Sequence, residues 1–134
     1  MTITLKTKLS FALIAGATLT ACESYAAGHT AGIVLETSTS MGTILTDTNG
    51  MSLYTFDSDS AGMSACNGGC AVNWPPLMVE DGAEASGKMS IITRADGSQQ
   101  WAYDGAPLYF WKNDRAAGQV TGDGVGGVWH VAKP

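Results

Sequence analysis

Gly50-Met-Ser-Leu-Tyr54-Thr-Phe56-Asp-Ser-Asp59 and Gly105-Ala-Pro-Leu-Tyr109-Phe-Trp111-Lys-Asn-Asp114 share one pattern of glycine, leucine, tyrosine, a second aromatic residue and aspartate. Corresponding positions lie 55 residues apart, and a tryptophan, Trp74 or Trp129, follows twenty residues after each tyrosine. Aligning residues 41–77 with residues 96–132 gives eight identities in 37 positions, concentrated on glycines and aromatic residues. This spacing predicts a duplicated structural unit.

Short segments of β-branched and aromatic residues surround the two copies and predict strands. Asx-Gly pairs at 49–50, 81–82, 96–97 and 104–105 favour tight turns between them. No later segment shows a sustained helical period of apolar residues, and 17 glycines oppose long helices. We expect an all-β fold with few or no helices after the signal peptide, in which two repeated hairpin-based units share one core as a small sandwich or barrel. The expected strands are 33–35, 43–45, 53–56, 77–79, 90–93, 100–103, 108–111 and 128–131.

Strand periodicity places the two aromatic residues of each motif on one face, with the aspartate just beyond, where the chain enters a loop. In one interpretation the rings stack on a ligand and the carboxylate orients one of its hydroxyl groups. In the other, the rings fill the core while the carboxylate caps loop N–H groups or accepts a tyrosine hydroxyl. We favour the second, because a duplicated core requires a duplicated pattern. The motif residues are Tyr54, Phe56, Asp59, Trp74, Tyr109, Trp111, Asp114 and Trp129.

The start of the chain is typical of a targeting segment. Lys6 and Lys8 precede an apolar stretch from Leu9 to Ala21, which is too short to span a bilayer comfortably. The sequence Leu19-Thr-Ala-Cys22 resembles the bacterial lipobox, which implies cleavage before Cys22 and lipidation of that cysteine. Ordinary cleavage after Ala26 or Ala27 is the alternative.

These features divide the chain into a signal peptide (1–21), a lipidated cysteine with a flexible tether (22–32) and one β domain (33–134) whose repeats cover about 41–77 and 96–132. We therefore expect a lipid-anchored protein of the bacterial envelope, with the membrane as its partner. Glu23, rather than an aspartate, follows the lipidated cysteine. This favours the outer membrane, with the domain facing the periplasm.

The charge of the mature chain argues against nucleic acid as a partner. After residue 21, five basic residues stand against twelve acidic ones, a formal net charge of −7. Such a surface repels phosphate backbones and anionic lipid headgroups.

Cys66 and Cys70 are the only cysteines left after Cys22, and in an oxidising compartment we expect a disulfide. An alternative is a soft-metal site for copper, with Met63 or His130 assisting the two thiolates. A third is thiol–disulfide chemistry, although the spacing is longer than the usual Cys-x-x-Cys. The favoured interpretation has no cofactor.

Enzyme signatures such as Gly-x-Ser-x-Gly, His-Glu-x-x-His or a phosphate-binding loop with lysine do not occur in the sequence. We therefore expect a protein that is not an enzyme.

The tyrosine motifs and the segment Cys66-Asn-Gly-Gly-Cys-Ala-Val-Asn-Trp74-Pro-Pro76 together resemble the bacterial secreted-repeat lipoproteins with a Tyr-x-(Phe/Trp/Tyr)-x-x-Asp motif. That resemblance covers essentially the whole mature chain and implies an envelope location, but no catalytic residues. The function we expect is non-catalytic binding of an unknown small ligand or an envelope protein. The alternative is a periplasmic copper-binding or thiol-redox accessory protein that uses Cys66 and Cys70.

Overall fold

The computed structural model describes residues 32–134, so the signal peptide, Cys22 and most of the expected tether lie outside the described residues. Three small antiparallel sheets contain strands β1 and β2, β3 and β7, and β4 to β6. The prediction of a mostly β fold from repeated units is confirmed, but residues 32–134 form no closed barrel. The elements are β1 (Val34–Thr39), β2 (Gly42–Asp47), β3 (Tyr54–Phe56), α1 (Gly69–Asn73), β4 (Met89–Thr93), β5 (Gln99–Tyr103), β6 (Ala106–Pro107), the 3₁₀ turn η1 (Val125–Gly127) and β7 (Trp129–Val131).

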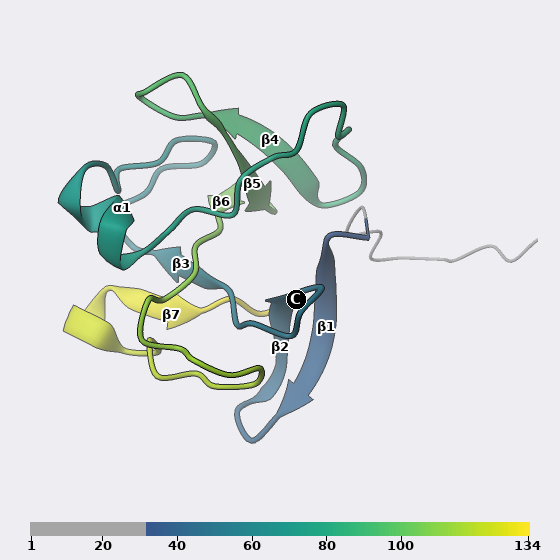
Figure 1. The fold of residues 1–134 in the computed structure, drawn as a ribbon, viewed down its shortest axis with the longest axis vertical. Helices are drawn as coiled ribbons and strands as arrows, with labels where there is room; N and C mark the ends of the chain where they lie inside the picture. Colours follow the sequence, from purple (N-terminus) through teal and green to yellow (C-terminus); the bar gives the residue numbers. More distant parts are fainter. Residues whose placement is uncertain (1–31) are drawn as a thin grey trace, which may run out of the picture.

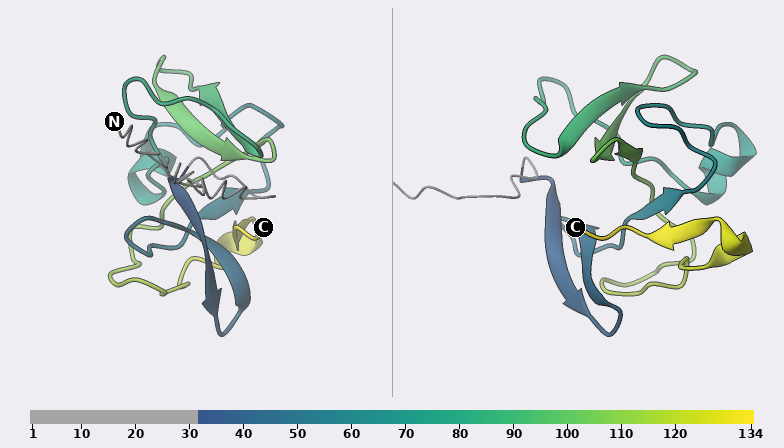
Figure 2. Two further views of the ribbon diagram at one scale, coloured as in Figure 1. Left: turned by 90° about the vertical axis from the view of Figure 1, so that its right-hand side faces the viewer. Right: turned by 180° about the vertical axis from the view of Figure 1, so that it is seen from behind.

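The β1–β2 and β4–β5 hairpins lie at opposite sides of the molecule, with β3 and β7 between them (Figure 1). The view from behind shows the same order (Figure 2). Val34 pairs with Asp47 in the first hairpin, and Met89 pairs with Tyr103 in the second. Within residues 32–134, no helix has the length and hydrophobicity needed to cross a bilayer.

Each hairpin is completed by a residue from the other repeat. Three backbone hydrogen bonds form a closed ring beside each hairpin, with N···O distances of 2.7–3.0 Å. One ring joins Leu45, Leu53 and Ala132, and the other joins Trp101, Leu108 and Leu77. Because Ala132 belongs to the second repeat and Leu77 to the first, the two repeats are interlocked.

The buried side chains form two clusters, and each draws on both repeats. The larger cluster surrounds Trp101 and includes Leu45, Leu53, Leu77 and Leu108. The second consists mainly of aromatic residues. Neither repeat therefore buries its apolar residues without the other, as expected for a shared core.

Two expected strands, 77–79 and 108–111, appear as isolated bridges. Tyr109 bridges both Tyr54 and Pro76, and Met78 bridges Gln100. Residues 73–76 run beside 110–112 as β7 runs beside β3, with Phe110 N donating to Pro75 O at 2.7 Å. Pro75 has no N–H to donate back to Phe110, so this pairing lacks the reciprocal hydrogen bond of a regular ladder.

Candidate functional site

The two motif tyrosines lie side by side where the repeats meet. Tyr54 N donates to Tyr109 O at 2.8 Å, and Tyr109 N donates to Tyr54 O at 3.0 Å. Such a reciprocal pair places an approximate two-fold axis between the tyrosines. Both side chains are fully buried. The motif strands of the two repeats therefore pair edge to edge in the interior of the domain.

Each tyrosine hydroxyl bonds to the aspartate of the other repeat. Tyr54 donates to Asp114 Oδ2 at 2.6 Å, and Tyr109 donates to Asp59 Oδ2 at 2.8 Å. The partners are 60 and 50 residues apart in sequence, whereas the aspartate of the same motif is only five residues away. We call these contacts the crossed Tyr–Asp pairs.

The same two carboxylates cap the loops that follow them. Asp59 Oδ1 accepts the backbone N–H of Ala65 at 2.7 Å, and Asp114 Oδ1 accepts that of Thr121 at 3.0 Å. Thr121 adds a side-chain bond of 2.6 Å to the same oxygen. Each aspartate thus orders its own loop with one oxygen and ties the repeats together with the other.

The environment of the crossed pairs extends the pH range over which the phenols stay protonated. Burial, assisted by the bond to Asp114, raises the pKa of Tyr54 well above its usual range. Burial, with a smaller contribution from Asp59, raises the pKa of Tyr109 to about 12. Burial also raises the pKa of Asp59, although the N–H of Ala65 and the Tyr109 hydroxyl oppose that shift. The tyrosines therefore act as hydrogen-bond donors and not as bases.

Four aromatic rings of the motifs form one continuous stack. Ring centroids are 4.3 Å apart for Phe56 and Trp129, 3.8 Å for Trp129 and Trp74, and 4.0 Å for Trp74 and Trp111. The inner rings, Trp74 and Trp129, are buried, whereas the outer rings, Phe56 and Trp111, are partly exposed. We call this set the aromatic stack.

Each motif tyrosine packs edge-on against an inner ring of the aromatic stack. Tyr54 contacts Trp74 with centroids 5.4 Å apart, and Tyr109 contacts Trp129 at 5.2 Å. Edge-to-face contacts of this kind are favourable for aromatic rings. The two-fold relation of the motifs therefore extends from the crossed pairs into the stack.

A buried arginine makes the two halves of the site different. Arg94, which follows β4, is 6% exposed and donates to Gln100 Oε1 at 2.7 Å and to Cys66 O at 2.6 Å. It also donates to Ser64 Oγ at 3.1 Å, and that hydroxyl is hydrogen-bonded to Tyr109 at 2.6 Å. Arg94, from the second repeat, thereby holds the cysteine-containing loop of the first.

Cys66 and Cys70 form a disulfide, as expected, at the start of α1. Cys66 is fully buried beside the tryptophans, and Cys70 packs against the same cluster. Other side chains of this segment are open to solvent, since Met63 is 67% and Val72 is 72% exposed. We call residues 60–76 the disulfide segment.

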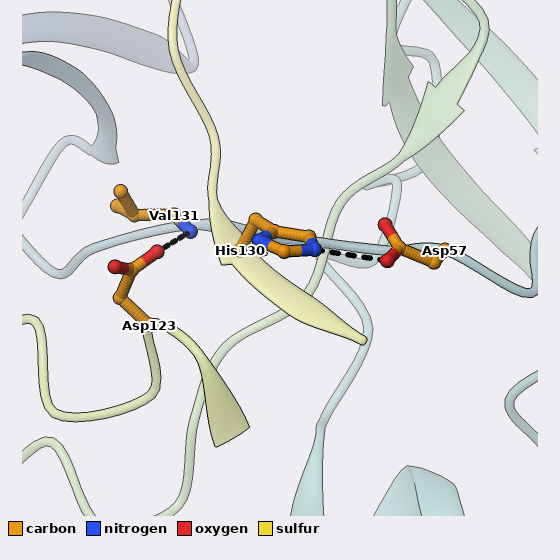
Figure 3. Close-up of polar contacts among 4 residues, drawn as sticks. All are labelled: Asp57, Asp123, His130 and Val131. Carbon is orange, nitrogen blue, oxygen red and sulfur yellow. Dashed lines mark hydrogen bonds and ion pairs between the residues drawn. The ribbon is translucent and has the colours of Figure 1, made fainter. Parts of the chain in front are cut away.

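The residues of the copper alternative do not form a metal site in this state. The two sulfurs are bonded to each other, and residues 32–134 contain no group of three or more His, Cys, Asp or Glu side chains that could hold a metal ion. His130 Nε2 lies instead 2.9 Å from Asp57 Oδ2 on the exposed side of β7 (Figure 3). Copper binding by the reduced protein stays the alternative hypothesis.

Asp123 provides a further contact of β7 that the sequence did not indicate. Its Oδ1 accepts the backbone N–H of Val131 at 2.9 Å, next to the contact between His130 and Asp57 (Figure 3). The contacts of Arg94 were not indicated by the sequence either, because a single arginine after an apolar strand is as compatible with an exposed position as with a buried one.

Comparison with known families places the chain in one of them. A family model described as a secreted repeat of unknown function matches residues 37–78 and again residues 90–133. No curated protein and no solved structure matches the sequence. The two matches confirm the resemblance and the duplication, and the family implies an extracellular or envelope location. The chain, with two crossed copies of the tyrosine motif, therefore belongs to this family of secreted repeats.

Proposed function

We propose that this protein is a lipid-anchored, non-catalytic interaction module that holds the disulfide segment, residues 60–76, out from the envelope to bind a protein partner. The observation that carries the proposal is the use of the motif residues inside the domain. Both tyrosine hydroxyls bond to aspartates of the opposite repeat, and both inner tryptophans are buried. These residues build a scaffold, in which the motif carboxylates accept hydrogen bonds from tyrosine hydroxyls and loop N–H groups instead of facing a ligand.

The disulfide segment has the properties expected of a binding element. Only the first repeat contains the cysteines and the Pro-Pro sequence, so duplication of the fold does not require them. Its Met63 and Val72 are the most exposed large apolar side chains among residues 32–134. An adaptable methionine beside a rigid backbone suits contact with an apolar protein surface.

The backbone of the segment is fixed at three places. The disulfide closes the loop, Arg94 holds Cys66 O, and Phe110 N donates to Pro75 O at 2.7 Å. A preordered loop loses less conformational entropy on binding than a mobile one. The fold thus fixes the backbone of this segment and leaves the side chains of Met63 and Val72 exposed.

Anchoring at Cys22 places the module at the membrane. Several acyl chains, each methylene contributing about 0.8 kcal/mol, make such attachment effectively permanent. With Cys22→Ser, we expect the protein to leave the membrane fraction and remain folded. Continued membrane association would contradict the lipid anchor but not the binding surface.

The binding surface is tested by photo-cross-linking in intact cells. A photoreactive residue is placed at position 63 or 72, and at Leu35 as a control, because Leu35 is 44% exposed but lies on the β1–β2 hairpin. We expect a discrete adduct from positions 63 and 72 that is absent at position 35. When the probe is at one of these two positions, we expect the adduct to be lost if the other position is changed to aspartate. Adducts of equal yield at all three positions, or at none, would contradict the proposal.

A further inference from the structure

The aromatic stack has a chemical property that close packing does not by itself require. Tryptophan and tyrosine are among the side chains that give up a single electron most readily, and three of the four stacked rings are tryptophans. Electron tunnelling falls steeply with distance, so rings at centroid separations of 3.8 and 4.0 Å exchange charge easily. Trp111, at one end, is partly exposed, whereas Trp74 and Trp129 are buried. The stack therefore connects the surface with the interior.

The inner end of this path is a hydrogen-bonded phenol on each side. Tyr54 contacts Trp74, and Tyr109 contacts Trp129. A phenol that loses an electron becomes a strong acid and must release its proton. In a buried site the proton needs an acceptor already in place, and Asp114 and Asp59 lie 2.6 and 2.8 Å from the two hydroxyl oxygens. Each tyrosine is thus paired with both an electron path and a proton acceptor.

We propose that the aromatic stack and the crossed Tyr–Asp pairs form a site that takes up oxidising equivalents from one-electron oxidants of the radical or high-potential metal-complex class. The oxidant removes one electron from Trp111 and is itself reduced by one electron. Trp74 fills the vacancy, and Tyr54 in turn supplies an electron to Trp74. The O–H bond of Tyr54 then breaks, its proton moves to Asp114 Oδ2, and a neutral tyrosyl radical and a carboxylic acid remain.

The second branch follows the same balance. Trp129 is in contact with Trp74, and Tyr109 supplies the electron while its proton moves to Asp59 Oδ2. A one-electron reductant reverses both movements on either branch. The redox site consists of the aromatic stack and the crossed Tyr–Asp pairs and includes none of the exposed side chains of the disulfide segment. Its failure would therefore leave the proposed binding function unaffected, and the reverse also holds.

Flash photolysis of the full chain in detergent, with a photogenerated ruthenium(III) polypyridyl complex as the oxidant, tests this site. Transient absorption and electron paramagnetic resonance distinguish tryptophan from tyrosyl radicals. We expect a tryptophan radical that decays as a tyrosyl radical appears, and we expect deuterated solvent to slow that step. A tryptophan radical that decays without any tyrosyl signal would overturn the proposal without the use of a variant.

Matched variants locate the radical. The double variant Tyr54→Phe/Tyr109→Phe is expected to lose the tyrosyl signal, whereas Tyr103→Phe, which removes a buried tyrosine outside the stack, is expected to keep it. A tyrosyl yield that persists in the double variant would contradict the assignment.

The proton acceptor is tested with Asp114→Asn in a Tyr109→Phe background, where only the Tyr54 branch operates. Asparagine keeps an Oδ1 for the bonds from Thr121 but removes the charged acceptor at Oδ2. We expect tyrosyl formation to slow by about 10²-fold, the usual contribution of a positioned base. An unchanged rate in a variant whose near-ultraviolet circular dichroism matches that of its parent would show that Asp114 accepts no proton.

Discussion

Gly122 provides the sharpest test of how tightly the repeats are packed together. A Cβ atom at this position would lie 2.9 Å from Tyr54 Cε1 and Cζ and 3.0 Å from Trp111 Cγ. Ordinary contacts begin at 3.4 Å, so the Tyr54 ring must move by about 0.5 Å or more. Because the Tyr54 hydroxyl is 2.6 Å from Asp114, that movement also strains a charged hydrogen bond.

We expect Gly122→Ala to lower the free energy of unfolding by about 2–5 kcal/mol, which combines overpacking with a weakened hydrogen bond to a charged group. Gly69→Ala is the matched control, since a Cβ there meets nothing within 4 Å and the residue opens α1. The control gains about 0.4–1 kcal/mol from reduced entropy of the unfolded chain. Urea unfolding of both variants, followed by far-ultraviolet circular dichroism, gives the comparison. Two variants of equal stability would refute the packing described here.

Three further predictions concern the tyrosines and cysteines. Unfolded tyrosine titrates near pH 10 and folded Tyr109 at about 12, so stability should fall by about 1.4 kcal/mol per pH unit per tyrosine across that window; urea midpoints of Tyr109→Phe should fall less steeply, and parallel curves would contradict this. Reduction of the disulfide should cost about 2 kcal/mol and accelerate amide exchange in residues 64–73 more than in β1 and β2, whereas equal acceleration would argue against a local role. The reduced protein should bind less than one equivalent of Cu(I) by competition with a chelating dye, and full uptake would favour the copper alternative.

The elements of the fold follow from local sequence signals. Short β-branched and aromatic segments indicated the strands of both hairpins, but an Asx-Gly pair marks only the turn between β4 and β5, since Ser40 and Met41 form the turn between β1 and β2. After β5, Asp104, with φ of 49°, precedes Gly105, with φ of 84°, as a tight turn requires. The uniform spacing of 55 residues holds only after this turn. Before it, the hydrogen-bonded equivalents Leu45 and Trp101 lie 56 residues apart, because the turn after β2 is one residue longer.

The crossed connection between the repeats could not be predicted from the motif. A tyrosine and an aspartate five residues apart suggest a contact within one repeat. Because the two motifs have the same spacing, the sequence does not distinguish the aspartate of the same repeat from the aspartate of the other. Which aspartate reaches which hydroxyl depends on how the motif strands pair, and that pairing is set by contacts distant in sequence. The burial of Arg94 has the same origin, since its acceptors Cys66 O and Ser64 lie in the other repeat.

A pair of double-mutant cycles tests the crossed architecture most directly. Tyr54→Phe is combined with Asp114→Asn in one cycle and with Asp59→Asn in the other, and the free energy of unfolding is measured for each variant. We expect a coupling energy of about 1.5–3 kcal/mol between Tyr54 and Asp114, the range for a hydrogen bond to a charged group. Between Tyr54 and Asp59 we expect coupling below about 0.5 kcal/mol. Strong coupling of Tyr54 to Asp59, with none to Asp114, would contradict the exchange of partners between the two repeats.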